Sequence, residues 1–116
     1  MATRIDILKL QEEDRFIEGD LEVRDLIITG GTLIVTGTVS VEGCVEIING
    51  SLIVANDLRC APNFIVIDSD VSARYIWVAQ SAFIGLSDIY ANVGIKTYDI
   101  YVYESEIQAP FVESVN

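Results

Sequence analysis

A serine followed by an acidic residue recurs at a fixed interval in the C-terminal half of the chain. Three segments share the pattern Ser-acidic-aliphatic-x-Ala, and they are residues 69–73, 87–91 and 105–109, with 18 residues between successive copies. If 18 residues make one structural repeat, Asp70, Asp88 and Glu106 form a column of carboxylates about 4.8 Å apart. Such a column can bind Lys and Arg side chains of a partner, or a divalent cation. Alternatively, the Ser-Asp pairs cap backbone amides at tight corners.

Two further groups of residues are candidates for partner binding. No basic residue lies between Arg24 and Arg59, so Glu42 and Glu46 are expected to belong to a negative surface on the middle of the molecule. Trp, Tyr and Arg dominate binding hot spots, and three aromatic residues that alternate with apolar neighbours are expected to point outward. These candidates are Trp77, Tyr101 and Tyr103. The alternatives are a merely solvated acidic face and the ordinary surface aromatics of a β-rich protein.

The residue types exclude most kinds of catalysis. The chain has no histidine, which removes the usual general base, the usual zinc ligand and every Ser-His or Cys-His pair. Cys44 and Cys60 form neither a disulfide framework nor a tetrahedral zinc site, and we interpret both as small apolar fillers. We therefore expect no catalytic residues, no cofactor, no metal and no enzymatic activity.

The charge balance limits the possible partners. The 116 residues include 7 Lys and Arg against 18 Asp and Glu, a formal net charge of −11, and 51% of the residues are apolar. The apolar fraction is sufficient for a folded core. The negative field disfavours direct binding to nucleic acid or to anionic membranes and favours a basic protein surface.

The elements that must position the candidate residues are short strands. Aliphatic residues open a new extended segment about every six residues from Leu21 to Val112, with Gly, Asn, Asp and Ser between the segments. Three strands and three corners would make one coil of about 18 residues. The sequence predicts an all-β fold, a single-stranded right-handed parallel β-helix (β-solenoid) of about six coils. A single domain would span 1–116, with 1–20 as an N-terminal cap or the first coil.

The same register assigns inner and outer positions. Ile76, Ile89 and Ile100 are predicted to lie in the lumen, and the residues that follow each of them, Trp77, Tyr90 and Tyr101, are predicted to be exposed. The four outward aromatics, which include Tyr103, fall on different faces, so we expect no single continuous stripe of them. Phe64 and Phe83 are expected to stack with each other inside or at a corner.

Segments 19–23 and 37–43, Gly-Asp-Leu-Glu-Val and Gly-Thr-Val-Ser-Val-Glu-Gly, resemble the coils of bactofilins. The core of these polymer-forming cytoskeletal proteins is a compact right-handed β-helix. The later coils of the Asp-Ile-x-Ala type look like degenerate versions of pentapeptide-repeat solenoids. The first resemblance implies a scaffold that polymerises end to end. The second implies an acidic rod that imitates nucleic acid.

Two functions are therefore carried forward. The first is a non-catalytic acidic protein-interaction module, an inhibitor that occupies the basic nucleic-acid-binding surface of a partner protein. The alternative is a bactofilin-like, self-assembling scaffold, that is, a homo-oligomer. The start of the chain lacks the basic and long apolar regions of a secretory signal, and no apolar run is long enough to cross a bilayer. We expect a cytoplasmic location and no membrane partner.

Overall fold

The computed structural model describes residues 2–60 and 62–114, so residues 1, 61, 115 and 116 of the predicted domain lie outside the described residues. The described part consists of strands and connecting corners, without a helix. The strands are β1 (Ala2–Gln11), β2 (Arg15–Ile17), β3 (Asp20–Val35), β4 (Val39–Val41), β5 (Cys44–Val54), β6 (Asp57–Cys60), β7 (Asn63–Ile67), β8 (Asp70–Gly85), β9 (Asp88–Tyr103), β10 (Glu106–Gln108) and β11 (Val112–Ser114).

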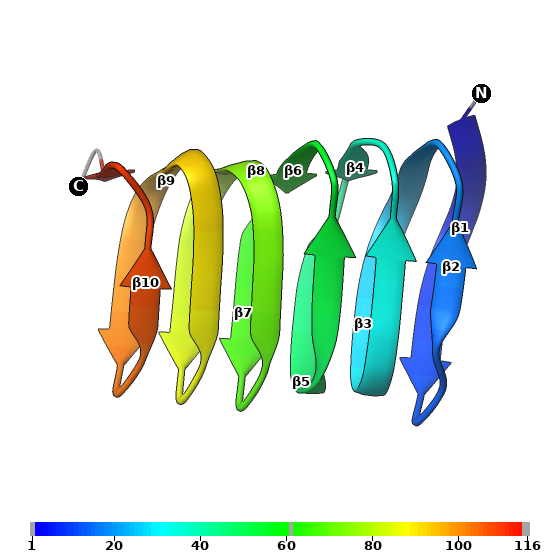
Figure 1. Ribbon diagram of the computed structural model, residues 1–116, viewed down its shortest axis with the longest axis horizontal. Coiled ribbons are helices and arrows are strands. Elements are labelled where there is room, and N and C mark those ends of the chain that lie inside the picture. The colour runs from blue at the N-terminus through cyan, green and yellow to red at the C-terminus, as the bar shows by residue number, and fades with distance from the viewer. Residues whose placement is uncertain (1, 61, 115–116) are drawn as a thin grey trace.

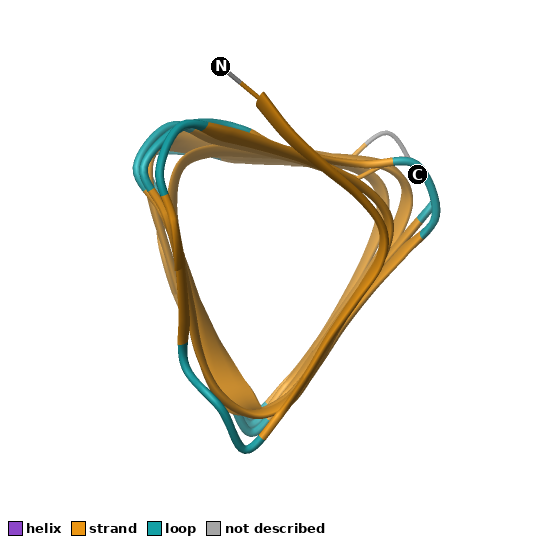
Figure 2. Cartoon of the chain, turned by 90° about the vertical axis from the view of Figure 1, so that its right-hand side faces the viewer, coloured by secondary structure: helices purple, strands orange, loops and turns teal. Residues whose placement is uncertain are grey.

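Every strand pairs in parallel with the chain one coil later. Leu21 pairs with Val39, and Val39 pairs with Leu58, steps of 18 and 19 residues. Figure 1 shows the coils side by side, and Figure 2 shows that they enclose a triangle and wind clockwise away from a viewer at the N-terminal end. The predicted β-solenoid of about six coils is confirmed.

The triangle has three faces, each built from all the coils. Face one runs from residues 2–5 to β11, face two from residues 7–11 to residues 99–103, and face three from β2 to β10. The corner between faces two and three, at the bottom of Figures 1 and 2, is called the lower corner. In the last three coils it consists of residues 68–70, 86–88 and 104–106.

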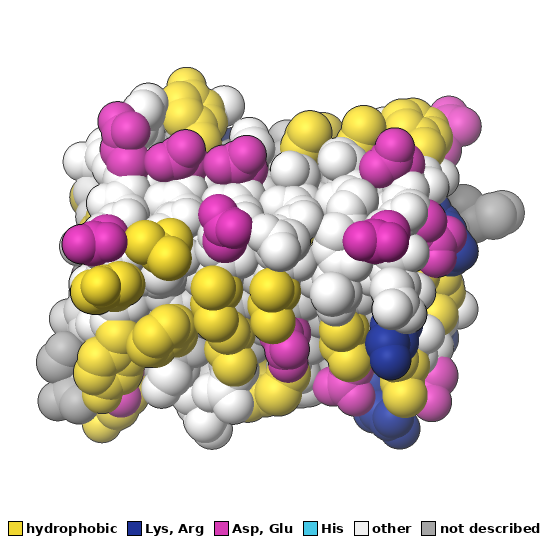
Figure 3. All heavy atoms as spheres, turned by 90° about the horizontal axis from the view of Figure 1, so that it is seen from below, with side chains coloured by type: hydrophobic (Ala, Val, Ile, Leu, Met, Phe, Trp, Pro, Cys, Tyr) yellow, Lys and Arg dark blue, Asp and Glu magenta, His cyan; other side chains and the backbone are white. Residues whose placement is uncertain are grey.

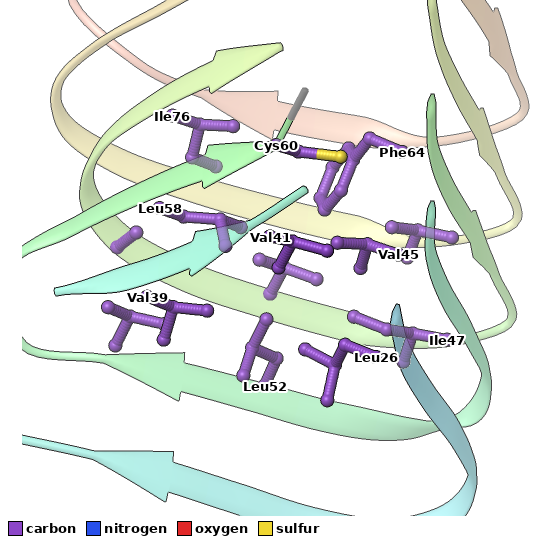
Figure 4. Packing of buried hydrophobic residues seen from close by; sticks show 14 of the residues in the cluster. Leu26, Val39, Val41, Val45, Ile47, Leu52, Leu58, Cys60, Phe64 and Ile76 are labelled. Atoms are coloured by element: carbon purple, nitrogen blue, oxygen red, sulfur yellow. The ribbon is translucent and has the colours of Figure 1, made fainter. Parts of the chain in front are cut away.

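Alternating side chains fill the lumen, as strand geometry requires. Leu26, Leu52 and Phe64 point inward from different faces and pack together (Figure 4). Ile76 and Ile89 are each 1% exposed, which confirms their predicted burial. Ile100, in the last coil, is only partly buried. The predicted exposure of the outward aromatics is also confirmed, and these are Trp77, Tyr90 and Tyr101.

Phe83 lies on the opposite side of the strand from the predicted one. The register pairs Phe64 with Ala82 and pairs Ile65 with Phe83, so Phe64 is buried whereas Phe83 points outward and is 45% exposed. The expected stacking of the two phenylalanines was wrong because the spacing of 19 residues exceeds the local repeat of 18 by one. A shift of one residue reverses the face of a strand side chain.

The N-terminal segment forms the first coil. Thr3 pairs with Leu21 and Leu10 pairs with Ile28, both in parallel. Leu8 and Leu10 are buried in the core. Of the two possibilities for residues 1–20, the described residues therefore support a coil that continues the solenoid.

Candidate functional site

The three predicted acidic residues stack at the lower corner. Asp70 pairs with Asp88, and Asp88 pairs with Glu106, each one coil apart. All three side chains are exposed. Figure 3, which looks onto this corner, shows a row of acidic side chains along one end of the molecule. The column predicted from the interval of 18 residues is present, with a spacing of about 4.8 Å set by the neighbouring strands.

The serines that precede these acidic residues hold the corner together. The backbone N–H of Ser69 donates to the hydroxyl of Ser87 at 3.1 Å, and the N–H of Ser87 donates to the hydroxyl of Ser105 at 3.0 Å. Each hydroxyl also donates to the carbonyl two residues earlier, at 2.7 to 2.8 Å. Ser69 and Ser87 are buried. These hydroxyls satisfy backbone groups that burial would otherwise leave unpaired.

The fold makes no comparable use of the carboxylates. Within the described residues, the side chains of Asp70 and Asp88 take part in no hydrogen bond or ion pair, and Glu106 only accepts a bond from Gln108 Nε2 at 3.1 Å. The earlier coils differ, because the carboxylates of Asp14, Asp20 and Asp25 accept backbone N–H bonds from the next coil at 2.8 to 3.0 Å. Corner capping, the structural alternative for the column, therefore describes the aspartates of the first coils and not Asp70 or Asp88.

A second row of the lower corner adds charge and an apolar side chain. One residue per coil has a left-handed backbone, and this row consists of Glu12, Gly30, Asn49, Asp68, Leu86 and Glu104. Asp68 and Glu104 bring two more exposed carboxylates beside the column, also without an ion pair in the described residues. Leu86 lies between them, half exposed, with a φ of 51°. The sequence analysis missed this row, whose only signal was the turn-forming Gly30 and Asn49.

The acidic column forms a ridge between two shallow depressions. One, of about 430 Å³, follows the lower corner from Gly31 to Asp88. The other, of about 310 Å³, lies on the face-three side and is bordered by Ile53 and Tyr90. Asp70 and Asp88 line both depressions. A partner side chain placed in either depression would contact these two carboxylates.

The predicted negative surface on the middle coils is not continuous. Glu42 Oε1 lies 3.8 Å from Arg4 Nη2, and the same guanidinium reaches Glu22 at 3.9 Å. The prediction considered only neighbours along the sequence, whereas the solenoid places the first coil within reach of the third. Glu46 lies apart from this pair, on face two.

The aromatic candidates are distributed as expected over different faces. Trp77 lies on face one between Arg59 and Lys96, and Tyr101 and Tyr103 lie on face two in the last coil. Tyr103 is adjacent to the lower corner, because the corner begins at Glu104. The structure thus brings together Asp70, Asp88, Glu106 and Tyr103, and leaves Glu42 and Trp77 elsewhere.

The two cysteines are free thiols with different environments. Cys60 is buried and its Sγ donates to the carbonyl of Asn63 at 2.7 Å, whereas Cys44 is half-buried. Burial raises the pKa of the Cys60 thiol to about 12, so it remains protonated and is a poor nucleophile at neutral pH.

Two other kinds of site were sought in the same coordinates. Residues 2–60 and 62–114 contain no group of three or more Asp, Glu or Cys side chains arranged to hold a metal ion. Nor do these residues include a helix long and apolar enough to cross a membrane.

Comparison with known proteins identifies no relative, since no family model, no curated protein and no solved structure matches the chain.

Proposed function

We propose that the chain is a non-catalytic acidic interaction module whose lower corner binds a basic surface of a partner protein. The observation that carries this proposal is the column of Asp70, Asp88 and Glu106, whose carboxylates stack in register and are not needed by the fold. Stacked like charges destabilise neighbouring strands. A cost of this kind is offset when a partner supplies Lys or Arg side chains, which form charge-assisted hydrogen bonds with carboxylates.

The proposed partner surface is one that otherwise binds nucleic acid. From Asp70 to Glu106 the column spans two strand spacings, about 10 Å. This length corresponds to roughly three successive phosphates along one strand of DNA, which are about 3.4 Å apart along the helix axis. Asp68 and Glu104 extend the charge in a second row. The chain would then act as an inhibitor by occupying the partner's phosphate-binding residues. The free thiols of Cys44 and Cys60 fit the cytoplasmic location that accompanies this proposal.

Displacement of DNA from a basic peptide tests the proposal. The probe is a fluorescent DNA duplex bound to a synthetic Lys/Arg-rich peptide, titrated with the protein. A variant with Asp70→Asn, Asp88→Asn and Glu106→Gln should require about tenfold more protein to release the DNA, since each exposed charge pair contributes up to about 1 kcal/mol.

The matched control loses three negative charges elsewhere. It carries Glu18→Gln, Glu22→Gln and Glu113→Gln, all at exposed positions away from the lower corner. This control should release DNA as the parent does. Equal weakening of the two variants would mean that net charge alone drives the binding, and the lower corner would not be the site.

The second candidate function is a self-assembling scaffold, as the bactofilin resemblance implies. It is favoured by the open C-terminal end of the lumen, where the inward-position residues Val102 and Val112 are 48% and 45% exposed. Unpaired strand edges are templates for association. Electron microscopy of the pure protein tests this candidate, because filaments would support end-on assembly and small discrete particles would reject it.

A further inference from the structure

Face two carries an apolar surface that the proposed function does not use. The outward side chains of this face include seven apolar residues, called here the apolar strip, which are Ile27, Ile48, Ile65, Ile67, Phe83, Tyr101 and Tyr103. Tyr101 and Tyr103 are 58% and 59% exposed. Figure 3 shows apolar side chains along the length of the molecule beside the acidic row. Contiguous apolar surface of this kind marks an interaction site.

Face two is wide enough for a dimer interface. Its strands contribute five residues each, as in Asn63–Ile67, whereas face three contributes three in coils such as Val71 to Ala73. Five residues span about 16 Å, and the molecule is 33 Å long. Two copies meeting on this face would bury about 1,000 Å² in total, which is the lower limit for a specific interface.

Few charges oppose the approach of a second copy on this face. Among the described residues, the outward ionisable side chains of face two are Lys9, Asp25, Glu46 and Asp99. Asp25 is already engaged, since it accepts the N–H of Cys44 at 3.0 Å and lies 3.4 Å from Arg24 Nε. In a chain with a net charge of −11, an apolar face with so few ionised groups is where two copies can meet with little repulsion.

The order of side chains along the strip selects an antiparallel arrangement. If the first coil of one copy faces the last coil of the other, Lys9 lies opposite Tyr101 and forms a cation–π pair. In the same arrangement Ile27 lies opposite Phe83, and Ile48 lies opposite Ile67. A parallel arrangement would instead place like charges together, Lys9 against Lys9 and Glu46 against Glu46.

We propose that face two is the interface of a homodimer in which two copies pack antiparallel, with the first coil of each against the last coil of the other. The inference is independent of the proposed function of the lower corner. Its main cost is Glu46, which faces the apolar Ile65 of the second copy and has no ion pair within the described residues. Burying an unpaired carboxylate is unfavourable. The dimer should therefore be weak, and removal of this charge should strengthen it.

Analytical ultracentrifugation of the parent and three variants tests the interface. Phe83→Ser should weaken the dimer at least tenfold, because a two-fold interface contains each substitution twice. Tyr90→Ser, on face three, is the control for loss of an exposed aromatic and should leave the dimer unchanged. Glu46→Gln should tighten dimerisation at least tenfold, and higher salt should tighten the parent dimer by screening the acidic corners.

Three results would overturn the inference. One is a parent that stays monomeric at millimolar concentration, and another is equal weakening by Phe83→Ser and Tyr90→Ser. The third is a dimer that Glu46→Gln leaves unchanged. The gain expected from Glu46→Gln keeps the test decisive even if Phe83→Ser impairs folding, which circular dichroism would reveal.

Discussion

The backbone N–H of Ser87 donates to the hydroxyl of Ser105 in the next coil at 3.0 Å, and the hydroxyl of Ser105 donates in turn to the carbonyl of Tyr103 at 2.8 Å. The same pair of bonds links Ser69 and Ser87 one coil earlier. Hydroxyls thus connect the last three corners of the solenoid. The carboxylates that follow them in the sequence are left for other contacts.

Removal of one hydroxyl from this ladder should destabilise the fold. We expect Ser87→Ala to lower the free energy of unfolding by about 1 to 3 kcal/mol, because the N–H of the buried Ser69 loses its acceptor. Chemical denaturation measures the change. Ser72→Ala is the control, since the side chain of Ser72 is hydrogen-bonded to no described residue. An equal effect of the two substitutions would show that the ladder does not stabilise the corner.

Replacement of the leucine at the lower corner should stabilise the protein. Leu86 has a left-handed backbone with a φ of 51°, a conformation that costs a bulky L-residue about 1 kcal/mol and that asparagine tolerates. Asn49 occupies the equivalent corner three coils' ladder positions earlier in the row of left-handed residues. Leu86→Asn should therefore raise the unfolding free energy by up to about 1 kcal/mol. Leu86→Ala keeps the unfavourable backbone and should give no such gain in the same denaturation experiment.

A charge in the lumen should abolish cooperative unfolding. Ile89 is 1% exposed, and burial of an unpaired carboxylate by Ile89→Asp costs several kcal/mol, against a total stability of about 5 to 15 kcal/mol for a small domain. Thermal denaturation followed by circular dichroism measures the outcome. The neighbouring Tyr90→Asp, at a half-exposed position, should still melt cooperatively. If the two variants melt alike, the assignment of inner and outer positions is wrong.

The buried thiol predicts a dependence of stability on alkaline pH. The pKa of Cys60 is about 12 in the folded protein, against an ordinary value of 9.0. Because the folded state holds this proton more tightly, the stabilising contribution is complete below pH 9 and is lost as the pH rises toward 12. The unfolding free energy of the parent should therefore fall more steeply above pH 9 than that of Cys60→Ala. Parallel pH curves for the two proteins would contradict this account.

Much of the fold could be predicted because the repeat is written in residue types. The interval of 18 residues in the Ser-acidic pattern placed Asp70, Asp88 and Glu106 in one column, and that register is present. Alternation within the strands likewise predicted the buried Ile76 and Ile89. Both inferences need only a constant repeat, and the repeat is constant in this half of the chain.

The remaining errors arose where the repeat changes or where contacts cross coils. The spacing from Phe64 to Phe83 is one residue longer than the local coil, so Phe83 points outward. The pairing of Arg4 with Glu42 joins residues two coils apart, which spacing along the sequence does not reveal. The division of roles between Ser69 and Asp70 also depended on three-dimensional geometry, since either side chain can cap a corner.

The central claim is that the lower corner uses its serines for folding and its carboxylates for a partner. The most direct test is isothermal titration of a Lys/Arg-rich peptide into the parent and into the variant with Asp70→Asn, Asp88→Asn and Glu106→Gln, at about 50 and 200 mM salt. We predict that the variant keeps or exceeds the parent's melting temperature. Its affinity at low salt should be about tenfold weaker, with a smaller dependence on salt. Unchanged affinity at both salt concentrations, or a variant that no longer folds, would contradict the claim.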